Sequence, residues 1–497
     1  MHLSRRALLG VLGTLPLARV ARGAAAHRLT LLHLNDFHSR HEAVNVRALS
    51  CGGGEGCFGG SARLATAVQM QRAAAEADGR TVLLLDGGDQ FQGSLFFTKY
   101  RGMAELAVQQ ANGTDAMAVG NHEFDQGPAV LAAYAEAAGF PLVTSNVDAS
   151  AEPALAGRLR PWVVLERGGL KIGFVGLTTL ETTTGSSPGR NVQFLPPKPA
   201  LARAIEGARG EGAQLIVLLS HMGVLFDRAL DVPGPAVVIG AHSHVLLSNT
   251  EPGAFGPDAQ ANPAGALVTQ AGAYGRYLGR LDLDLADDGS VLAHGGDCVH
   301  VGLDLVEDPA VAAIVARFAA SLDTFRNEIV ATLPEALELS SCRFTQCALG
   351  QAVAAAMLAT AHGGQIAITN AGGMRTGLPA GPISRGQILE AMPFGNTVAT
   401  LKLTGAEVEA AVRHGLSQVG RGGFPQWAGL RLTATGLETP TDTGWASLDP
   451  ETTYLVVTNN FLRNGGDGYV IFRDRGKEAY DNGPGVDDTF VTALSRP

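Results

Sequence analysis

Short apolar runs, each directly followed by polar side chains that can bind a metal ion, constrain the fold of this chain more than any other feature. The runs are residues 29–34, 81–85, 115–119, 215–219 and 236–239. Helix-like segments such as 62–76 and 129–138 lie between them. Buried strands that alternate with helices indicate an α/β fold with a largely parallel or mixed sheet. Ligands of such sheets bind beyond the carboxyl ends of the strands, so the residues after each run are the candidates for a functional site.

The residues after the runs fit a centre of two divalent metal ions. They are Asn35-Asp36-Phe37-His38, Asp86-Gly87-Gly88-Asp89-Gln90, Gly120-Asn121-His122-Glu123-Phe124-Asp125, Ser220-His221 and Gly240-Ala241-His242-Ser243-His244. A single His at a strand end is more often a surface residue than a ligand, but five such ends are hard to explain as independent accidents. Mixed oxygen and nitrogen ligands suit zinc or manganese, and their number suits two ions that share a carboxylate.

The turn 120–125 brings a neutral oxygen ligand, an imidazole and a carboxylate together within six residues. The alternative is an ordinary polar loop, because Gly, Asn and Asp are common in turns. The other four strand ends favour the functional interpretation.

Four of these blocks resemble the signature of the calcineurin-like metallophosphoesterases. They are Asp36-Phe37-His38, Gly88-Asp89-Gln90, Gly120-Asn121-His122-Glu123 and Gly240-Ala241-His242-Ser243-His244. Their order and spacing resemble the 5'-nucleotidase branch, and most closely the ecto-5'-nucleotidase type. The resemblance implies an α/β fold with an N-terminal layered α/β/β/α metallophosphoesterase domain, a helical linker that acts as a hinge, and a smaller C-terminal α/β substrate-binding domain.

The resemblance also implies a role for each candidate in the first half. Asp36 and His38 would hold one metal ion, Asn121, His221 and His242 would hold the other, and Asp89 would bridge the two. His244 would join the first ion, although 5'-nucleotidases carry an amide side chain at its position and related phosphoesterases carry His. His122 would stabilise charge on the transferring phosphoryl group, with Asp125 orienting its imidazole.

In the second half, short polar blocks lie between apolar runs. They are residues 342–347, 370–375 and 460–468. Gly-rich blocks usually mark turns, but together these supply arginines for a phosphate, polar groups for hydroxyls and aromatic rings for a base. By resemblance to the C-terminal domain of 5'-nucleotidases, Arg343, Arg375 and Asn370 would grip the phosphate. Phe394 and Phe461 would stack on the base, and Asp467 would bind the ribose hydroxyls.

The chain has five cysteines, of which four form two closely spaced pairs. We expect disulfides between Cys51 and Cys57 and between Cys342 and Cys347, with Cys298 as a free thiol. Both pairs fall where the ecto-5'-nucleotidase type has disulfides. A metal site is the alternative, but neither pair has the two-residue spacing of zinc ligands.

Length and composition predict an exported protein of two domains. At 497 residues, the chain is longer than a domain with one hydrophobic core usually is. Paired arginines at 5–6, an apolar run at 7–17 and small residues at 24–26 indicate a twin-arginine-like export signal over 1–26, with a short N-terminal helix as the alternative. The predicted domains are a metallophosphoesterase domain over 27–309, a linker helix over 310–332 and a nucleotide-binding domain over 333–497. We expect a periplasmic or extracellular location.

The net charge of -10 argues against a nucleic-acid partner. No later segment has the composition of a membrane span, and the sequence ends without an apolar anchor signal. The predicted partner is a small-molecule nucleotide. The predicted activity is hydrolysis of nucleoside 5'-monophosphates such as AMP, with two divalent ions, zinc first and manganese or cobalt as alternatives.

Other activities stay open at this point. The same centre in related proteins cleaves nucleotide sugars, nucleoside di- and triphosphates or 2',3'-cyclic nucleotides, or acts on sulfur-bound substrates. A nucleotide-binding module without catalysis is the remaining alternative, and it should have lost some of the ligand positions that are all filled here.

Overall fold

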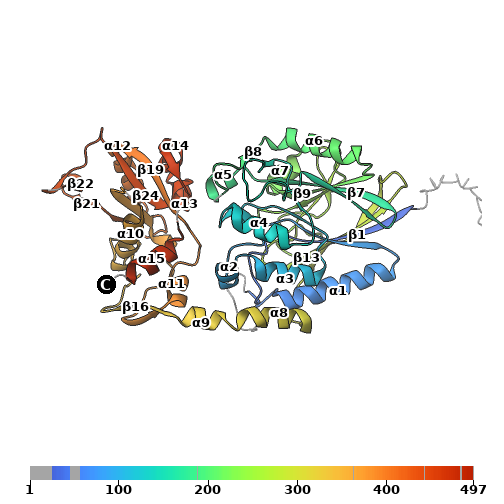
Figure 1. Cartoon of the computed structure of the whole chain (residues 1–497), viewed down its shortest axis with the longest axis horizontal. Coiled ribbons are helices and arrows are strands. Elements are labelled where there is room, and N and C mark those ends of the chain that lie inside the picture. Colours follow the sequence, from blue (N-terminus) through green and yellow to red (C-terminus); the bar gives the residue numbers. More distant parts are fainter. Residues whose placement is uncertain are drawn as a thin grey trace, which may run out of the picture.

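The chain forms two α/β domains that are joined along one side by helices α8 (Pro309–Ala319) and α9 (Leu322–Asn327) (Figure 1). The computed structural model describes residues 25–44, 56–186, 188–361, 363–441, 443–481 and 484–495. The predicted export signal over 1–26 therefore lies almost entirely outside the described residues, as does Cys51 of the predicted Cys51–Cys57 disulfide. Within the described part of the chain, no helix combines the length and apolar character needed to cross a bilayer.

The N-terminal domain contains two sheets that pack face to face. The first has the order β14-β13-β1-β2-β3-β4, with β15 beside β13. Its strands are β1 (His27–Leu34), β2 (Thr81–Asp86), β3 (Ala116–Ala118), β4 (Leu142–Val143), β13 (Tyr277–Leu285), β14 (Val291–Gly295) and β15 (Cys298–His300). The second has the order β11-β12-β10-β9-β7-β6. Its strands are β6 (Trp162–Arg167), β7 (Leu170–Thr178), β9 (Leu215–His221), β10 (Val237–Gly240), β11 (Gln260–Ala261) and β12 (Leu267–Thr269).

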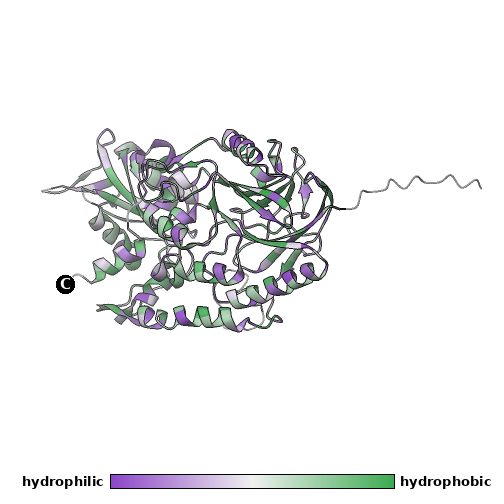
Figure 2. Ribbon diagram, turned by 45° about the vertical axis from the view of Figure 1, so that its right-hand side comes forward, coloured by the Kyte–Doolittle hydropathy of each residue, from purple (hydrophilic) through white to green (hydrophobic). Residues whose placement is uncertain are grey.

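Helices cover the outer face of each sheet, which confirms the predicted α/β/β/α layers. Along β1, Leu29 and Leu31 face the second sheet, whereas Leu32 and Leu34 pack with Leu64 of α1 (Ser61–Ala77). Strand side chains alternate between faces, so β1 can fill two apolar layers at once. The other helices of this domain are α2 (Leu95–Tyr100), α3 (Met103–Asn112), α4 (Pro128–Ala137), α5 (Thr182–Gly185), α6 (Pro197–Gly210) and α7 (Val224–Ala229). Figure 2 shows hydrophobic residues along the strands between these layers.

The C-terminal domain is built on one mixed sheet with the order β20-β17-β24-β19-β25. Its strands are β17 (Ile366–Asn370), β19 (Val398–Thr404), β20 (Pro425–Ala428), β24 (Thr453–Asn459) and β25 (Lys477–Tyr480). One face packs against α10 (Ala348–Thr360) and α15 (Val486–Leu494), and the other against α12 (Gly405–Leu416) and α14 (Val470–Arg475). The remaining elements are β16 (Ile329–Leu333) paired with β18 (Gly381–Ser384), α11 (Arg385–Ala391), α13 (Asn460–Arg463), and the ribbon β21 (Arg431–Thr433), β22 (Gly436–Thr441) and β23 (Gly444–Ser447).

The linker differs from the single helix predicted over 310–332, because it breaks between α8 and α9 and its last residues belong to strand β16 (Ile329–Leu333). At the break, α2 supplies hydrogen bonds from outside the helix: Lys99 Nζ donates to the carbonyl of Ser321 and Tyr100 Oη donates to that of Phe318.

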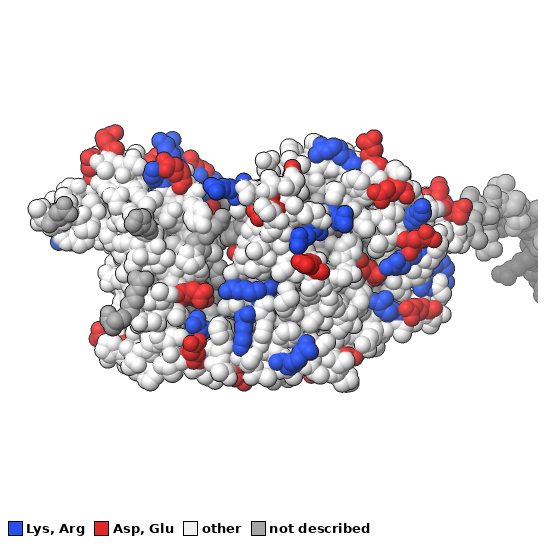
Figure 3. Space-filling model, viewed as in Figure 1, with Lys and Arg blue, Asp and Glu red and all other residues white. Residues whose placement is uncertain are grey.

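Acidic and basic residues are interspersed over both domains on the face shown in Figure 3.

Candidate metal centre and substrate site

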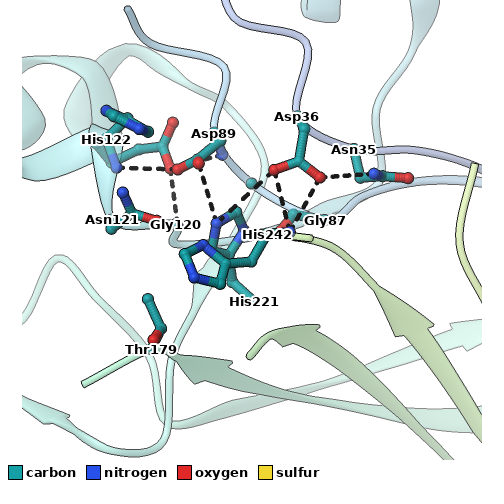
Figure 4. Close-up of polar contacts among 12 residues, drawn as sticks. Asn35, Asp36, Gly87, Asp89, Gly120, Asn121, His122, Thr179, His221 and His242 are labelled. Atoms are coloured by element: carbon teal, nitrogen blue, oxygen red, sulfur yellow. Dashed lines mark hydrogen bonds and ion pairs between the residues drawn. The ribbon is translucent and has the colours of Figure 1, made fainter. Parts of the chain in front are cut away.

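The predicted ligands converge where the carboxyl ends of the two sheets meet. Strands β1, β2 and β3 are parallel neighbours in one sheet, and β9 and β10 are parallel neighbours in the other. The loops after β1, β2, β3 and β10 and the last residue of β9, His221, carry every candidate ligand, and Figure 4 shows Asp36, Asp89, Asn121, His221 and His242 around one space. Residues more than 200 positions apart in sequence therefore share one site.

The side chains form three overlapping groups in which the potential ligand atoms all lie within 4.8 Å of one another. These groups are Asp36-His38-His244, His38-Asp89-His122 and Asp89-His221-His242. His221 Nε2 lies 3.1 Å from Asp89 Oδ2, and His38 Nε2 lies 3.9 Å from the same oxygen. Asp89 thus lies between two groups of ligands, the position that a bridging carboxylate needs.

The backbone at this site adopts conformations that only a constrained structure maintains. Five candidate ligands have a left-handed φ between 50° and 70°: Asp36, His38, Asp89, His242 and His244. Such values are uncommon for residues other than Gly, and they concentrate where a fold places side chains for function. Position 120 has no room for a side chain, because a Cβ there would lie 2.2 Å from Asp89 Oδ1, so only Gly fits beside this ligand.

The donors in this space fit divalent ions. The Nδ1 atoms of His38 and His221 lie 3.2 Å and 2.8 Å from the carbonyl oxygens of Phe91 and Gly87. A carbonyl only accepts, so Nδ1 carries a proton in each ring, and Nε2 is the nitrogen left to bind an ion. Asn121 Oδ1 is buried without a hydrogen-bond partner among the described residues, which suits an oxygen ligand.

Two of the charge states already suit metal binding, whereas, against the effect of burial, Asp89 raises the pKa of His221 to about 9, so that imidazole must lose a proton when an ion binds. Burial by itself would raise the pKa of Asp89, but His221 and His122 hold it well below its ordinary value. Burial lowers the pKa of His38 to about 3. Ligands must be deprotonated to bind an ion, and these two residues already are at neutral pH.

His122 and Asp125 form a hydrogen-bonded pair at the edge of this centre. His122 Nδ1 lies 2.6 Å from Asp125 Oδ2, and the other carboxylate oxygen of Asp125 accepts the hydroxyl of Ser186. Although burial opposes it, the carboxylates of Asp125 and Asp89 raise the pKa of His122 to about 10. The His122 side chain is 31% exposed, so a substrate can reach an imidazole whose orientation is held from behind.

In the C-terminal domain, the structure brings Asn370 and Asp467 together. Asn370 Nδ2 donates to Asp467 Oδ2 over 2.8 Å, and Asn459 Nδ2 donates to Asn370 Oδ1 over 3.0 Å. The main-chain oxygen of Asp467 accepts from Gln418 Nε2. Asn459 and Gln418 were not predicted from the sequence, where nothing distinguishes them from other polar residues.

The predicted aromatic residues lie at the boundary between the domains. Phe394 and Phe461 are 48% and 43% exposed, and the guanidinium of Arg375 lies 5.7 Å from the centre of the Phe394 ring. The Phe394 carbonyl accepts a 2.9 Å hydrogen bond from Gln92 Nε2 of the N-terminal domain, and α13, which carries Phe461, contacts α5.

Arg343 is exposed and its main-chain oxygen accepts from Gly420. Among the described residues, no hydrogen bond, ion pair or cation–π contact joins its side chain to the other predicted substrate residues.

Comparison with known proteins identifies the family. Residues 29–246 match the calcineurin-like phosphoesterase family, and residues 329–474 match the 5'-nucleotidase C-terminal domain. Human 5'-nucleotidase is 31% identical over 91% of this chain and 85% of its own length. The chain belongs to the 5'-nucleotidase family. It is a metal-dependent phosphoester hydrolase, and its family supports action on nucleotides.

Two further proteins are similar to this member of the 5'-nucleotidase family. The crystal structure of the 5'-nucleotidase precursor from Thermus thermophilus is 35% identical, with a TM-score of 0.66 over 94% of this chain and 96% of that one. The trifunctional nucleotide phosphoesterase protein YfkN of Bacillus subtilis (strain 168) is 33% identical over 90% of this chain, which spans 32% of that longer protein.

Glu123 is a structural residue of the 5'-nucleotidase site that the sequence analysis did not single out. It is fully buried, and its carboxylate accepts the main-chain N–H groups of Asp89, Gln90 and Gly120. It therefore ties the loop after β2 to the loop after β3. Its place within the 120–125 motif was the available signal, but only the tertiary structure shows which groups it binds.

The cysteines agree with the prediction where they are described. Cys342 and Cys347 form a disulfide, and Cys298 is a buried free thiol. The disulfide closes a short loop that carries Arg343, and Cys347 caps α10, where its Sγ accepts from the N–H of Gly350.

Proposed function

We propose that this protein is a 5'-nucleotidase that hydrolyses nucleoside 5'-monophosphates such as AMP to nucleoside and phosphate. The observation that carries the proposal is the placement of exposed Phe394 and Phe461 on the edge of the C-terminal domain that meets the metal-bearing domain. Aromatic rings in that position can stack on a base while the phosphate reaches the metal centre.

We assign one ion to Asp36, His38 and His244 and the second to Asn121, His221 and His242, with Asp89 shared. The groups Asp36-His38-His244 and Asp89-His221-His242 support this assignment for every ligand except Asn121. Two bound divalent ions would polarise the phosphoryl oxygens and make water a competent nucleophile at neutral pH. The mixed imidazole and carboxylate donors favour zinc, with manganese or cobalt as alternatives.

The residues of the chain then position and stabilise the reacting group. The His122 imidazolium, oriented through Nδ1 by Asp125, stabilises charge on the phosphoryl oxygens. Arg343, Arg375 and Asn370 grip the phosphate from the C-terminal domain, where guanidinium groups match its oxygens. Asp467, already fixed by Asn370, accepts the ribose hydroxyls.

A second candidate activity concerns nucleotides with other phosphate linkages. The name of the Bacillus subtilis relative, a trifunctional nucleotide phosphoesterase, favours it for this chain as well. Nucleotide sugars, di- and triphosphates and 2',3'-cyclic nucleotides are the substrates to compare.

The purified protein should be tested against AMP, UDP-glucose, 2',3'-cyclic AMP and p-nitrophenyl phosphate, with zinc added. We expect the highest kcat/KM with AMP, because p-nitrophenyl phosphate offers no ribose and a smaller ring. Equal kcat/KM for AMP and p-nitrophenyl phosphate would contradict a nucleotide-reading C-terminal domain. Preference for the cyclic nucleotide or UDP-glucose would support the second candidate.

We further propose export to the periplasm or outside the cell, on the strength of the N-terminal arginine pair and apolar run. Amino-terminal sequencing of the secreted protein tests this, and cleavage next to residue 26 is the expected result.

A further inference from the structure

Tyr274 contacts all three members of one group of candidate ligands. Its main-chain N–H donates to the carbonyl of Asp36 over 2.8 Å, and its ring lies 5.7 Å from that of His38. Its hydroxyl lies 3.2 Å from His244 Nδ1, with the two rings edge to face at 5.3 Å. A single residue thus touches all three residues that would hold one ion.

His244 needs such support more than the other histidines of the centre. Its side chain is 35% exposed, whereas those of His38 and His221 are 8% and 0% exposed. Packing therefore holds His244 least, and an exposed imidazole loses more conformational freedom when it is fixed on an ion. Its Nε2 still lies 3.4 Å from Asp36 Oδ1 and 3.0 Å from His38 Nε2, close enough to share an ion with both.

The group next to Nδ1 of His244 is a hydroxyl, which differs in chemistry from the groups next to Nδ1 of the other two histidines. His38 and His221 are backed by main-chain carbonyls, which can only accept a hydrogen bond. A tyrosine hydroxyl can donate as well as accept, so Tyr274 suits either tautomer of His244 in the absence of an ion. An ion on Nε2 leaves the proton on Nδ1 and makes the hydroxyl the acceptor.

Tyr274 is itself held firmly. Its φ of 65° is left-handed, a strained value for a bulky residue, and the hydrogen bond to Asp36 maintains it. The guanidinium groups of Arg40 and Arg276 lie 5.8 Å and 5.4 Å from the centre of its ring. Cations near an aromatic ring are attracted to its electron-rich face, which restrains the ring further.

We propose that Tyr274 is a positioning residue for the ion held by Asp36, His38 and His244. Its hydroxyl accepts the Nδ1 proton of His244 and directs the Nε2 lone pair to the ion. This role rests on the metal centre of the proposed function, but it makes a separate claim, about affinity for one of the two ions.

The test is zinc binding by the full chain without nucleotide, measured by competition with a chelating dye. Tyr274→Phe keeps the ring and removes the hydroxyl. It should lower the affinity for one of the two zinc ions by about 10- to 100-fold, the usual effect of losing a group that orients a ligand. Tyr277→Phe is the matched control. Tyr277 is three positions along, and its ring packs against His300 rather than against any candidate ligand in the described chain, so zinc affinity should stay at the wild-type value.

A second variant separates positioning from a general structural effect. In a His244→Asn background, Tyr274→Phe should cause no further loss of zinc affinity, because the hydroxyl acts only through the imidazole. The melting temperature of the metal-free protein should be equal for Tyr274→Phe and wild type.

Wild-type zinc affinity of Tyr274→Phe, or a loss that persists in the His244→Asn background, would overturn the role of Tyr274. Neither result bears on the nucleotide specificity, which the AMP assay of the wild-type protein decides.

Discussion

Replacing His122 with Ala should lower kcat for AMP by about 100-fold with little change in KM, because the imidazole is proposed to act on charge that develops in the transition state. A 100-fold loss corresponds to about 2.7 kcal/mol of activation free energy. The main-chain N–H of His122, which donates to Asp89 Oδ1 over 2.9 Å, is kept in the variant, so the position of Asp89 should be unaffected.

Asp125 contacts the ring of His122 and the hydroxyl of Ser186, and no contact joins it to a candidate ligand within the described chain. Asp125→Ala leaves the imidazole present but unoriented, and we expect about a tenfold loss of kcat, or about 1.4 kcal/mol. If Asp125 acts only through His122, the double variant should lose about 100-fold, as His122→Ala does. Independent effects would multiply to about 1,000-fold.

Steady-state kinetics of the three variants with AMP, each at saturating zinc, measure these ratios. The metal content of each variant must be measured alongside, because His122 also belongs to a group of potential ligands with His38 and Asp89. Loss of an ion from His122→Ala would show that His122 is a ligand. A raised KM with unchanged kcat would instead make it a substrate-binding residue, and either outcome refutes the reasoning.

The remaining predictions concern the bridging ligand, base recognition and pH. Asp89→Asn should abolish nearly all activity and lower the affinity for both zinc ions, which metal analysis after dialysis would detect. Retention of two tightly bound ions would show that Asp89 does not bridge them. Phe461→Ala should weaken AMP binding by about 1 to 3 kcal/mol, whereas Phe344→Ala, 61% exposed on the same domain, should leave KM unchanged. Equal effects of these two variants would argue against stacking. Burial raises the pKa of Asp227 to about 8. The folded protein then holds a proton that the unfolded chain releases above about pH 4, so stability falls as pH rises toward 8, and the melting temperature of Asp227→Asn relative to wild type should rise between about pH 5 and about pH 8. A pH-independent difference would count against this explanation.

Much of the first domain was predictable, for reasons that particular residues show. The strands that begin the site, such as β1 and β9, are short apolar runs bounded by polar turns, and the structure has them within two residues of the predicted limits. The order and spacing of the four blocks that contain Asp36, Asp89, Asn121 and His242 also indicated the family. The linker was predicted less well, because it breaks between α8 and α9, where Lys99 and Tyr100 of a helix distant in sequence donate hydrogen bonds to its carbonyls.

The sequence by itself determined which chemical groups are available and at which strand ends they lie, since strand and turn preferences are local properties of the chain. It did not determine which of those groups meet. The tertiary structure decided that the ends of β1 to β3 face those of β9 and β10, and that Asn370 binds Asp467 from 97 residues away. It also placed Tyr274 against Asp36, His38 and His244, although no feature of its local sequence indicated a role. Contacts of this kind depend on sheet order and on the packing of one layer against another, which no single stretch of the chain specifies.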